Sequence, residues 1–141
     1  MAEEPLPKPV PEPDVVSRGF WESLRDTGKL AIQFCDRCSL YQHFPEPRCA
    51  RCGLGDELRY KAVSGEGEVY TFVITHQTPV KSLAANVPYA IAWVELPEQK
   101  ALRVVANIVN CDVASVRIGM RVRLVLERRG EWVIPQFEPA K

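Results

Sequence analysis

The sequence predicts a mainly β protein in which an N-terminal helix and a rubredoxin-like zinc ribbon precede a five-stranded OB-fold barrel. Two observations carry this prediction. Four cysteines form two C-x-x-C pairs, and the chain after them consists of short apolar runs separated by glycine, proline or polar residues. A length of 141 residues with 46% hydrophobic and 26% charged residues is typical of an ordinary globular protein.

The N-terminal segment, residues 1–16, is expected to be a flexible, proline-rich arm. Each proline removes a backbone donor and fixes φ, which favours an extended chain. A disordered leader and a segment that lies along a partner surface both fit this composition, and the first is the more usual behaviour. The segment lacks the apolar run of a signal peptide or membrane span, so we expect a cytoplasmic protein without membrane contact.

Residues 17–30 are predicted to form one short helix, with Ser17 as its cap and Gly28 at its end. Phe20 and Trp21 lie side by side on this helix. Two large aromatic side chains are expected to be buried, either against the protein's own barrel or against another chain.

The helix is expected to form one unit with a zinc ribbon over residues 17–57. The candidate ligands follow the spacing C-x2-C-x10-C-x2-C, and they are Cys35, Cys38, Cys49 and Cys52. Each C-x-x-C places two thiolates on a tight turn, and two facing turns complete a tetrahedron that suits Zn²⁺. Four thiolates leave no position for water, so the site is expected to be structural. Iron in a redox site, redox dithiols and a chance pattern are the alternatives.

Residues 58–141 are expected to form the OB-fold barrel. A long strand over residues 58–76, bent at Gly65 and Gly67, is the first of five. The other strands are predicted over residues 89–96, 101–108, 120–127 and 131–137. A short helical turn capped by Asp112 lies between the third and fourth strands, as an OB-fold requires.

Three other residues carry weaker signals. Cys111 follows an apolar strand and is expected to be a small buried hydrophobic residue rather than a nucleophile. His43 lies in the ribbon loop and is expected to face solvent. His76 ends a strand without a neighbouring carboxylate to orient it, which favours a structural role over a general base.

The charge balance and the motifs of the sequence argue against a nucleic-acid-binding protein and against several classes of enzyme. The chain has 18 basic and 18 acidic residues and a net charge of zero, so a nucleic-acid partner is not expected. The sequence contains no hydrolase nucleophile elbow, phosphate-binding loop or dinucleotide-binding fingerprint. The residues alone therefore indicate a binding protein with no evident catalytic constellation.

The order of the motifs resembles the zinc-ribbon plus OB-fold family called domain of unknown function 35. The resemblance covers roughly residues 17–137. It rests on the segments FWESLRDTGKL, CDRCSLYQHFPEPRCARCG, SGEGEVYTFVITHQTP, VPYAIAWVELPE and RIGMRVRLVLE. Ser39 departs from the glycine that the family often has after its second cysteine, which affects only a turn.

This resemblance implies a non-catalytic accessory subunit of a thiolase-superfamily enzyme that acts on acyl-CoA thioesters. Such a subunit docks near the CoA entrance of its partner in a hetero-oligomer and helps to bind or pass on the acyl-CoA. The resemblance also implies an alternative, a subunit that completes the active site of an acyl-CoA aldolase or hydratase in the degradation of sterol side chains or aromatic acids. A nucleic-acid-binding OB module is a third hypothesis, which the charge balance disfavours.

Contacts with the partner or with acyl-CoA are expected from the aromatic helix and from one face of the barrel. Phe20 and Trp21 match the aromatic helix of the family. The candidates in the barrel segment are Tyr70, Phe72, His76, Tyr89 and Trp93. Burial of these aromatic rings inside the barrel is the more usual outcome and stays open here.

Overall fold

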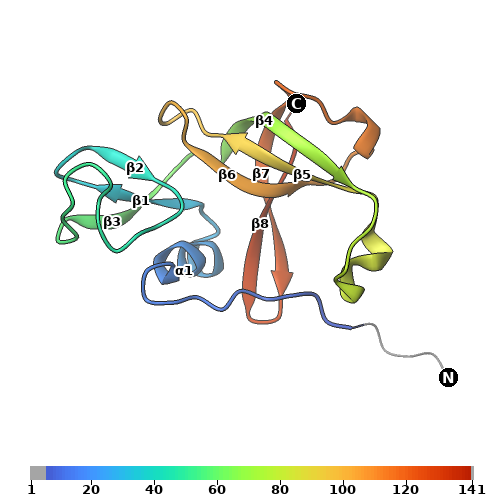
Figure 1. Ribbon diagram of the computed structural model, residues 1–141, viewed down its shortest axis with the longest axis horizontal. Coiled ribbons are helices and arrows are strands. Elements are labelled where there is room, and N and C mark those ends of the chain that lie inside the picture. Colours follow the sequence, from blue (N-terminus) through green and yellow to red (C-terminus); the bar gives the residue numbers. More distant parts are fainter. Residues whose placement is uncertain (1–5, 141) are drawn as a thin grey trace.

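The structure is a computed structural model that describes residues 6–140. Its strands form a three-stranded sheet in the order β2-β1-β3 and a closed barrel in the order β4-β5-β6-β8-β7 (Figure 1). The elements are α1 (Arg18–Thr27), β1 (Ala31–Cys35), β2 (Leu40–Gln42), β3 (Leu58–Ala62), β4 (Glu66–Thr75), η1 (Lys81–Asn86), β5 (Tyr89–Glu95), β6 (Arg103–Ile108), η2 (Val113–Ser115), β7 (Arg121–Arg129) and β8 (Trp132–Pro139). The predicted fold class is confirmed.

The helix α1 is shorter than the predicted range 17–30, and its start is built differently. Ser17 makes no capping hydrogen bond; its hydroxyl and its backbone N–H both donate to the carboxylate of Asp14, at 2.8 and 2.7 Å. The predicted stop at Gly28 is correct. Its φ of 70° ends the helix in the left-handed region, and its N–H donates to the carbonyl of Leu24 at 3.1 Å.

The strand predicted over residues 58–76 is two strands in two different sheets. Residues of β3 pair with β1 in the ribbon sheet, whereas β4 begins one residue after Gly65 and belongs to the barrel. Gly65 has a φ of 82°, which allows the chain to leave one sheet and enter the other. Every residue of β1 is buried. This central strand is flanked by β2 and β3 and packs against α1, and its Ile32 belongs to the hydrophobic core.

The barrel closes through a seam between β6 and β8. The other strand pairs are antiparallel, but β6 and β8 run parallel and pair at Ile108 and Phe137. Two side chains extend this short pairing: the N–H of Asn107 donates to Oε1 of Gln136 at 2.8 Å, and Nε2 of Gln136 donates to Oδ1 of Asn107 at 3.1 Å. This amide bridge explains why the polar side chain of Gln136 is buried at the seam.

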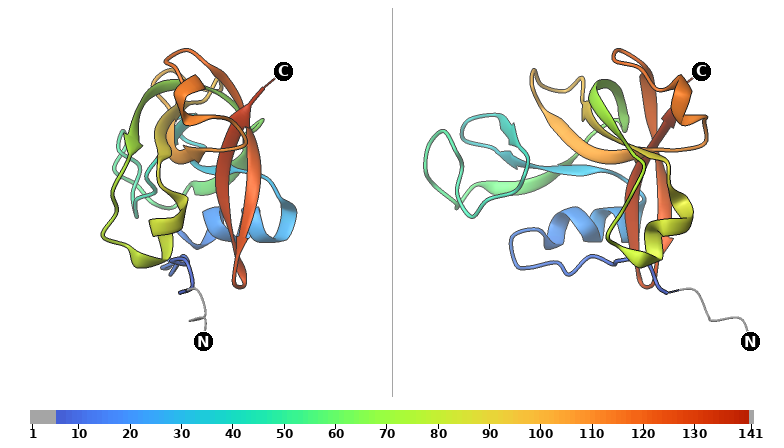
Figure 2. Two further views of the ribbon diagram at one scale, coloured as in Figure 1. Left: turned by 90° about the vertical axis from the view of Figure 1, so that its right-hand side faces the viewer. Right: turned by 45° about the vertical axis from the view of Figure 1, so that its right-hand side comes forward.

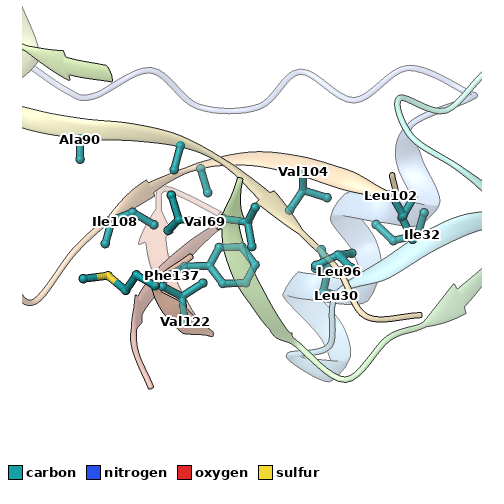
Figure 3. Packing of buried hydrophobic residues seen from close by; sticks show 14 of the residues in the cluster. Leu30, Ile32, Val69, Ala90, Leu96, Leu102, Val104, Ile108, Val122 and Phe137 are labelled. Carbon is teal, nitrogen blue, oxygen red and sulfur yellow. The ribbon is translucent and has the colours of Figure 1, made fainter. Parts of the chain in front are cut away.

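One hydrophobic core joins the helix, the ribbon and the barrel. Figure 3 shows Phe137, which is fully buried, beside Val69 and Val122 in the barrel. The same cluster continues towards Leu30 and Ile32 at the start of the ribbon. The ribbon is therefore fixed to the barrel by shared packing, and α1 lies below the ribbon and beside β8 of the barrel (Figure 2).

The described part of the arm lies along the tip of the β7–β8 hairpin (Figure 1). Nζ of Lys8 lies 3.2 Å from a carboxylate oxygen of Glu127, and the guanidinium of Arg129 donates to the carbonyl of Pro9 at 3.2 Å. Flexibility of the arm stays a prediction, and residues 1–5 lie outside the described part of the chain. Within residues 6–140, no helix has the length and apolar character needed to cross a membrane.

Candidate metal centre and ligand groove

The four predicted cysteines come together at one end of the ribbon. Cys35 ends β1, Cys38 follows in the first turn, and Cys49 and Cys52 lie in the second. Their sulfur atoms all lie within 4.8 Å of one another, and the Cys35–Cys52 and Cys38–Cys49 sulfur distances are both 3.9 Å. A tetrahedron with metal–sulfur bonds of about 2.3 Å has edges of about 3.8 Å, so the arrangement fits one tetrahedral metal ion.

The thiols of this cluster differ in their readiness to ionise. Hydrogen bonds from the backbone N–H groups of Cys52 and Arg51 lower the pKa of Cys49 to about 6. Burial and the neighbouring thiols raise the pKa of Cys38 to about 12. A divalent cation is the natural partner of such a set, because it stabilises every thiolate at once and releases their protons.

A groove of about 810 Å³ lies between the helix, the ribbon loop and the barrel. Phe20 and Trp21 of α1 and His43 and Phe44 of the ribbon loop contribute to its lining. The barrel contributes residues of β5, β6, β7 and β8, including both partners of the amide bridge, and η1 and the arm also contribute. This size and the mainly apolar lining are typical of a site for a small organic ligand.

Three of the predicted contact residues line this groove. Phe20 is only 7% exposed and belongs to the core, so the protein's own chain is its main cover. Trp21 is half-buried and packs edge-on against Phe20 with ring centres 5.0 Å apart, which leaves part of its surface free. Tyr89, at the start of β5, is half-buried and also lines the groove.

The other predicted residues lie elsewhere on the barrel. Tyr70 is 48% exposed, with the guanidinium of Arg103 3.6 Å from its ring centre. Phe72 packs against the core, and His76 is exposed just beyond the end of β4. Trp93 points outward from β5 and is 39% exposed. The structure therefore divides the five barrel candidates between the groove, the core and the outer face.

The expectation that His43 faces solvent is wrong. Its imidazole packs against two aromatic rings, with its centre 5.4 Å from that of Phe20 and 4.6 Å from that of Phe44. Burial lowers the pKa of His43 to about 4, so the ring is neutral near pH 7. The neighbouring aromatic residue Phe44 was the one local sign that His43 could be buried. The second ring that contacts His43, that of Phe20, comes from a distant part of the sequence and could not be predicted from local spacing.

These rings form a continuous series, which we name the aromatic row. It runs from Trp21 through Phe20, His43 and Phe44 to Trp93, whose ring centre is 6.2 Å from that of Phe44. The row connects α1, the ribbon loop and β5. The ribbon therefore contributes directly to the wall of the groove.

Polar side chains meet at the end of the groove beside the arm. The carboxylate of Glu127 accepts hydrogen bonds from Lys8 at 3.2 Å, Arg129 at 3.2 Å and Gln136 at 3.1 Å. Burial acts to raise the pKa of Glu127, but the Gln136 hydrogen bond, the charge of Arg129 and the Lys8 contact outweigh it. The pKa of Glu127 is therefore lowered, and the carboxylate stays ionised where the arm meets the barrel.

Cys111 lies at another part of the groove, after β6. It is half-buried and packs against the core, in keeping with its interpretation as a small hydrophobic residue. Among residues 6–140, the four ribbon cysteines are the one cluster whose side chains are placed to hold a metal ion.

A four-cysteine ribbon joined to a five-stranded OB-fold barrel is the two-part architecture that the structure defines. The chain belongs to the DUF35 family. A DUF35 domain-containing scaffold protein of Methanocaldococcus jannaschii is 33% identical over 109 residues, which are 77% of this chain and 74% of that protein. A second such scaffold protein, from Methanothermobacter thermautotrophicus, is 35% identical over 112 residues, or 77% of this chain and 79% of that protein.

Further comparisons extend to enzyme subunits. The family model of the C-terminal OB-fold domain of ChsH2 matches residues 60–127. The 3-oxo-4,17-pregnadiene-20-carboxyl-CoA hydratase alpha subunit of Mycobacterium tuberculosis is 32% identical over 120 residues, which are 85% of this chain and 36% of that subunit.

Two solved structures have the same fold. A chain of the Ltp2-ChsH2(DUF35) aldolase superimposes with a TM-score of 0.81 and 32% identity, covering 94% of this chain and all of that chain. A DUF35 protein from Sulfolobus solfataricus superimposes with a TM-score of 0.59 at 14% identity, covering 88% of this chain and 84% of that one. The second likeness concerns the fold alone.

Proposed function

We propose that this chain is a non-catalytic accessory subunit of a thiolase-superfamily enzyme that acts on acyl-CoA thioesters. The observation that carries the proposal is the similarity to two DUF35 domain-containing scaffold proteins, which supports a role in assembly. The similarity to a chain of the Ltp2-ChsH2(DUF35) aldolase, which extends over 94% of this chain, supports the role of a subunit. The chain docks beside the CoA entrance of its partner and helps to hold or pass on the acyl-CoA.

The groove is the part of the chain that we assign to the acyl-CoA. Its volume of about 810 Å³ and its aromatic lining suit an acyl group or the pantetheine arm. Trp21 and Trp93 mark the two ends of the aromatic row and both keep exposed surface. Large aromatic side chains of this kind are enriched where two proteins meet, so the exposed surface of Trp21, which lines the groove, and of Trp93, which lies outside it, is our candidate for the docking face.

We further propose that the cysteine cluster holds one Zn²⁺ ion with a structural role. The ribbon loop that carries His43 and Phe44 lies between Cys38 and Cys49, so the metal fixes both ends of that loop. The ion thereby holds one wall of the groove in place. Its contribution is to folding and positioning, because four thiolates complete its coordination.

A second candidate is a subunit that completes the active site of an acyl-CoA aldolase or hydratase. The similarity to the Mycobacterium tuberculosis hydratase alpha subunit and to the aldolase structure favours it. In this case a polar residue of the chain reaches the substrate of the partner. His76, exposed beyond the end of β4, is the residue expected from the sequence to do so.

Isolation of the chain from its native host, followed by mass spectrometry of the proteins that co-purify, tests the proposal. We expect a thiolase-superfamily chain in a stable complex, and we expect the isolated chain to turn over no acyl-CoA. Turnover of β-ketoacyl-CoA by the isolated chain would contradict the non-catalytic role. An aldolase or hydratase as the co-purifying enzyme, inactivated by His76→Phe with the complex intact, would favour the second candidate.

A further inference from the structure

We propose that His43 recognises the bound ligand, with the edge of its imidazole forming a hydrogen bond to an amide or thioester carbonyl of an acyl-pantetheine chain in the groove. This inference rests on the proposed function and adds a specific recognition residue to it. His43 is a positioning residue in this role, because it binds the chain of the ligand and takes no part in bond formation.

The imidazole of His43 packs against two aromatic rings. The interplanar angle is 30° with Phe20 and 35° with Phe44. Both contacts are tilted, and together they restrict the orientation of the imidazole plane. The two ring nitrogens lie in that plane, so any hydrogen bond of His43 points along its edge.

The ring nitrogens are free to bind a ligand. Over residues 6–140, the fully buried side-chain atoms that lack a hydrogen-bond partner are Glu98 Oε1, Arg103 Nε and Arg129 Nε. The nitrogens of His43 do not belong to this set and make no hydrogen bond to a described residue, so they keep access to the open space beside them. His43 also lines the groove, and that space is therefore available to a ligand.

The chemistry of the ring selects the class of group it binds. Burial keeps His43 neutral, so one nitrogen donates and the other accepts. A neutral donor–acceptor pair matches an amide, which offers an N–H and a carbonyl, and its donor also matches a thioester carbonyl. A phosphate is bound more strongly by a cation, whose charge assists the hydrogen bond. The pantetheine arm of an acyl thioester carries amide groups of the matching kind along a slender chain that fits an apolar groove.

The loop that carries His43 is held rigidly by the buried side chain of Gln33, which is 5% exposed. Its Nε2 donates to the carbonyl of Glu46 at 2.8 Å, and its Oε1 accepts the N–H of Glu46 at 2.9 Å and the side-chain amide of Gln42 at 2.7 Å. The residues on both sides of His43 are thus tied to β1. A group held in this way loses little freedom when it binds, which is the property expected of a recognition residue.

His43→Phe separates recognition from packing, because phenylalanine keeps the aromatic stack and removes both nitrogens. Octanoyl-CoA binding to the metal-loaded full chain is measured by isothermal titration calorimetry for the wild type, His43→Phe and Ile118→Ala. We expect His43→Phe to weaken binding about tenfold, or about 1.4 kcal/mol. Ile118→Ala, the control at a side chain that is 68% exposed and does not line the groove, should leave the affinity unchanged.

The outcomes distinguish failure of the inference from failure of the proposed function. Equal affinities for the wild type and His43→Phe would overturn the role of His43 and leave the groove as the binding site. A wild-type chain that binds no octanoyl-CoA would overturn both the inference and the acyl-CoA role of the groove. Metal content and the melting temperature report whether each variant is folded.

A second measurement covers the case in which His43→Phe does not fold. The chain has two histidines, so ¹⁵N-histidine labelling gives nitrogen resonances from only two rings, and His76→Phe assigns them. We expect the His43 nitrogens of the wild type to shift when octanoyl-CoA is added. Unchanged His43 resonances at a concentration that saturates the groove would overturn the inference without any change at His43 itself.

Discussion

Truncation of Phe20 to alanine tests whether the chain's own core holds α1. The ring of Phe20 is only 7% exposed and packs with Trp21 and His43, and the neighbouring Leu24 is 1% exposed. Replacement of a buried phenylalanine by alanine removes its burial and leaves a cavity, which costs about 3–5 kcal/mol. Leu24 still anchors the helix, so we expect Phe20→Ala to be destabilised towards the lower end of that range.

The expected loss of unfolding free energy corresponds to a shift of the melting temperature that thermal unfolding measures easily. A chain of this length has an unfolding entropy of about 0.3 kcal/mol per degree, so a loss of about 3–4 kcal/mol lowers the melting temperature by about 10–13 °C. Circular dichroism and calorimetry follow this transition in the wild type, Phe20→Ala and Trp21→Ala. Trp21 is only half-buried, so its truncation should lower the melting temperature much less.

Affinity for the co-purifying enzyme should depend on Trp21, whose truncation has the smaller effect on the melting temperature. Trp21→Ala should weaken the complex by about 2 kcal/mol, roughly thirtyfold, because exposed tryptophans at an interface contribute strongly. The metal content of Trp21→Ala should stay unchanged.

Two results would refute this reasoning. If Phe20→Ala melts at the same temperature as the wild type, the ring of Phe20 is not part of the core and α1 needs a partner to hold it. If Trp21→Ala binds as tightly as the wild type, the docking face lies elsewhere.

Three further predictions concern the metal, pH and close packing. Wild-type protein should contain one Zn²⁺ per chain by mass spectrometry. The double variant Cys35→Ser, Cys38→Ser should lose both the metal and much of its stability. Full stability of this variant would contradict a structural role for the metal. The pKa of His43, about 4 when folded against 6.5 when unfolded, means that the unfolded state binds more protons between these values. Stability should therefore fall by up to about 3 kcal/mol as the pH drops from 6.5 to 4, measured by urea unfolding, and His43→Phe should remove this part of the pH dependence. Gly19→Ala would place a Cβ atom in steric conflict with the ring of Tyr60. It should therefore lower the free energy of unfolding by about 1–3 kcal/mol although alanine favours helices, and an unchanged melting temperature would contradict this contact.

The sequence predicted those features that depend on local spacing. The two C-x-x-C pairs bring their own ligands together, so the cluster of Cys35, Cys38, Cys49 and Cys52 needed no knowledge of the distant chain. Gly28 ends the helix because its own backbone adopts a positive φ. The strand alternation and punctuation placed the barrel strands, and their number and order follow the OB-fold.

The features that the sequence did not predict depend on contacts between distant residues. The division of residues 58–76 into two strands arises because β3 finds its partner in β1, which pairs with it from Ala31 to Cys35. His43 is buried because α1 brings Phe20 against it. Alternation along β5 shows that Trp93 and its neighbours face opposite sides, but it does not show which side is the interior.

The seam between β6 and β8 gives the barrel a preferred line of opening. The backbone pairing there is limited to Ile108 and Phe137, whereas β7 and β8 pair from end to end. Local fluctuations of a folded protein concentrate where few backbone hydrogen bonds must break together. Asn107 and Gln136 cross this line and also line the groove, so a molecule bound in the groove rests on both sides of it. A ligand in the groove would therefore bridge the seam, and its binding would oppose the opening of the barrel.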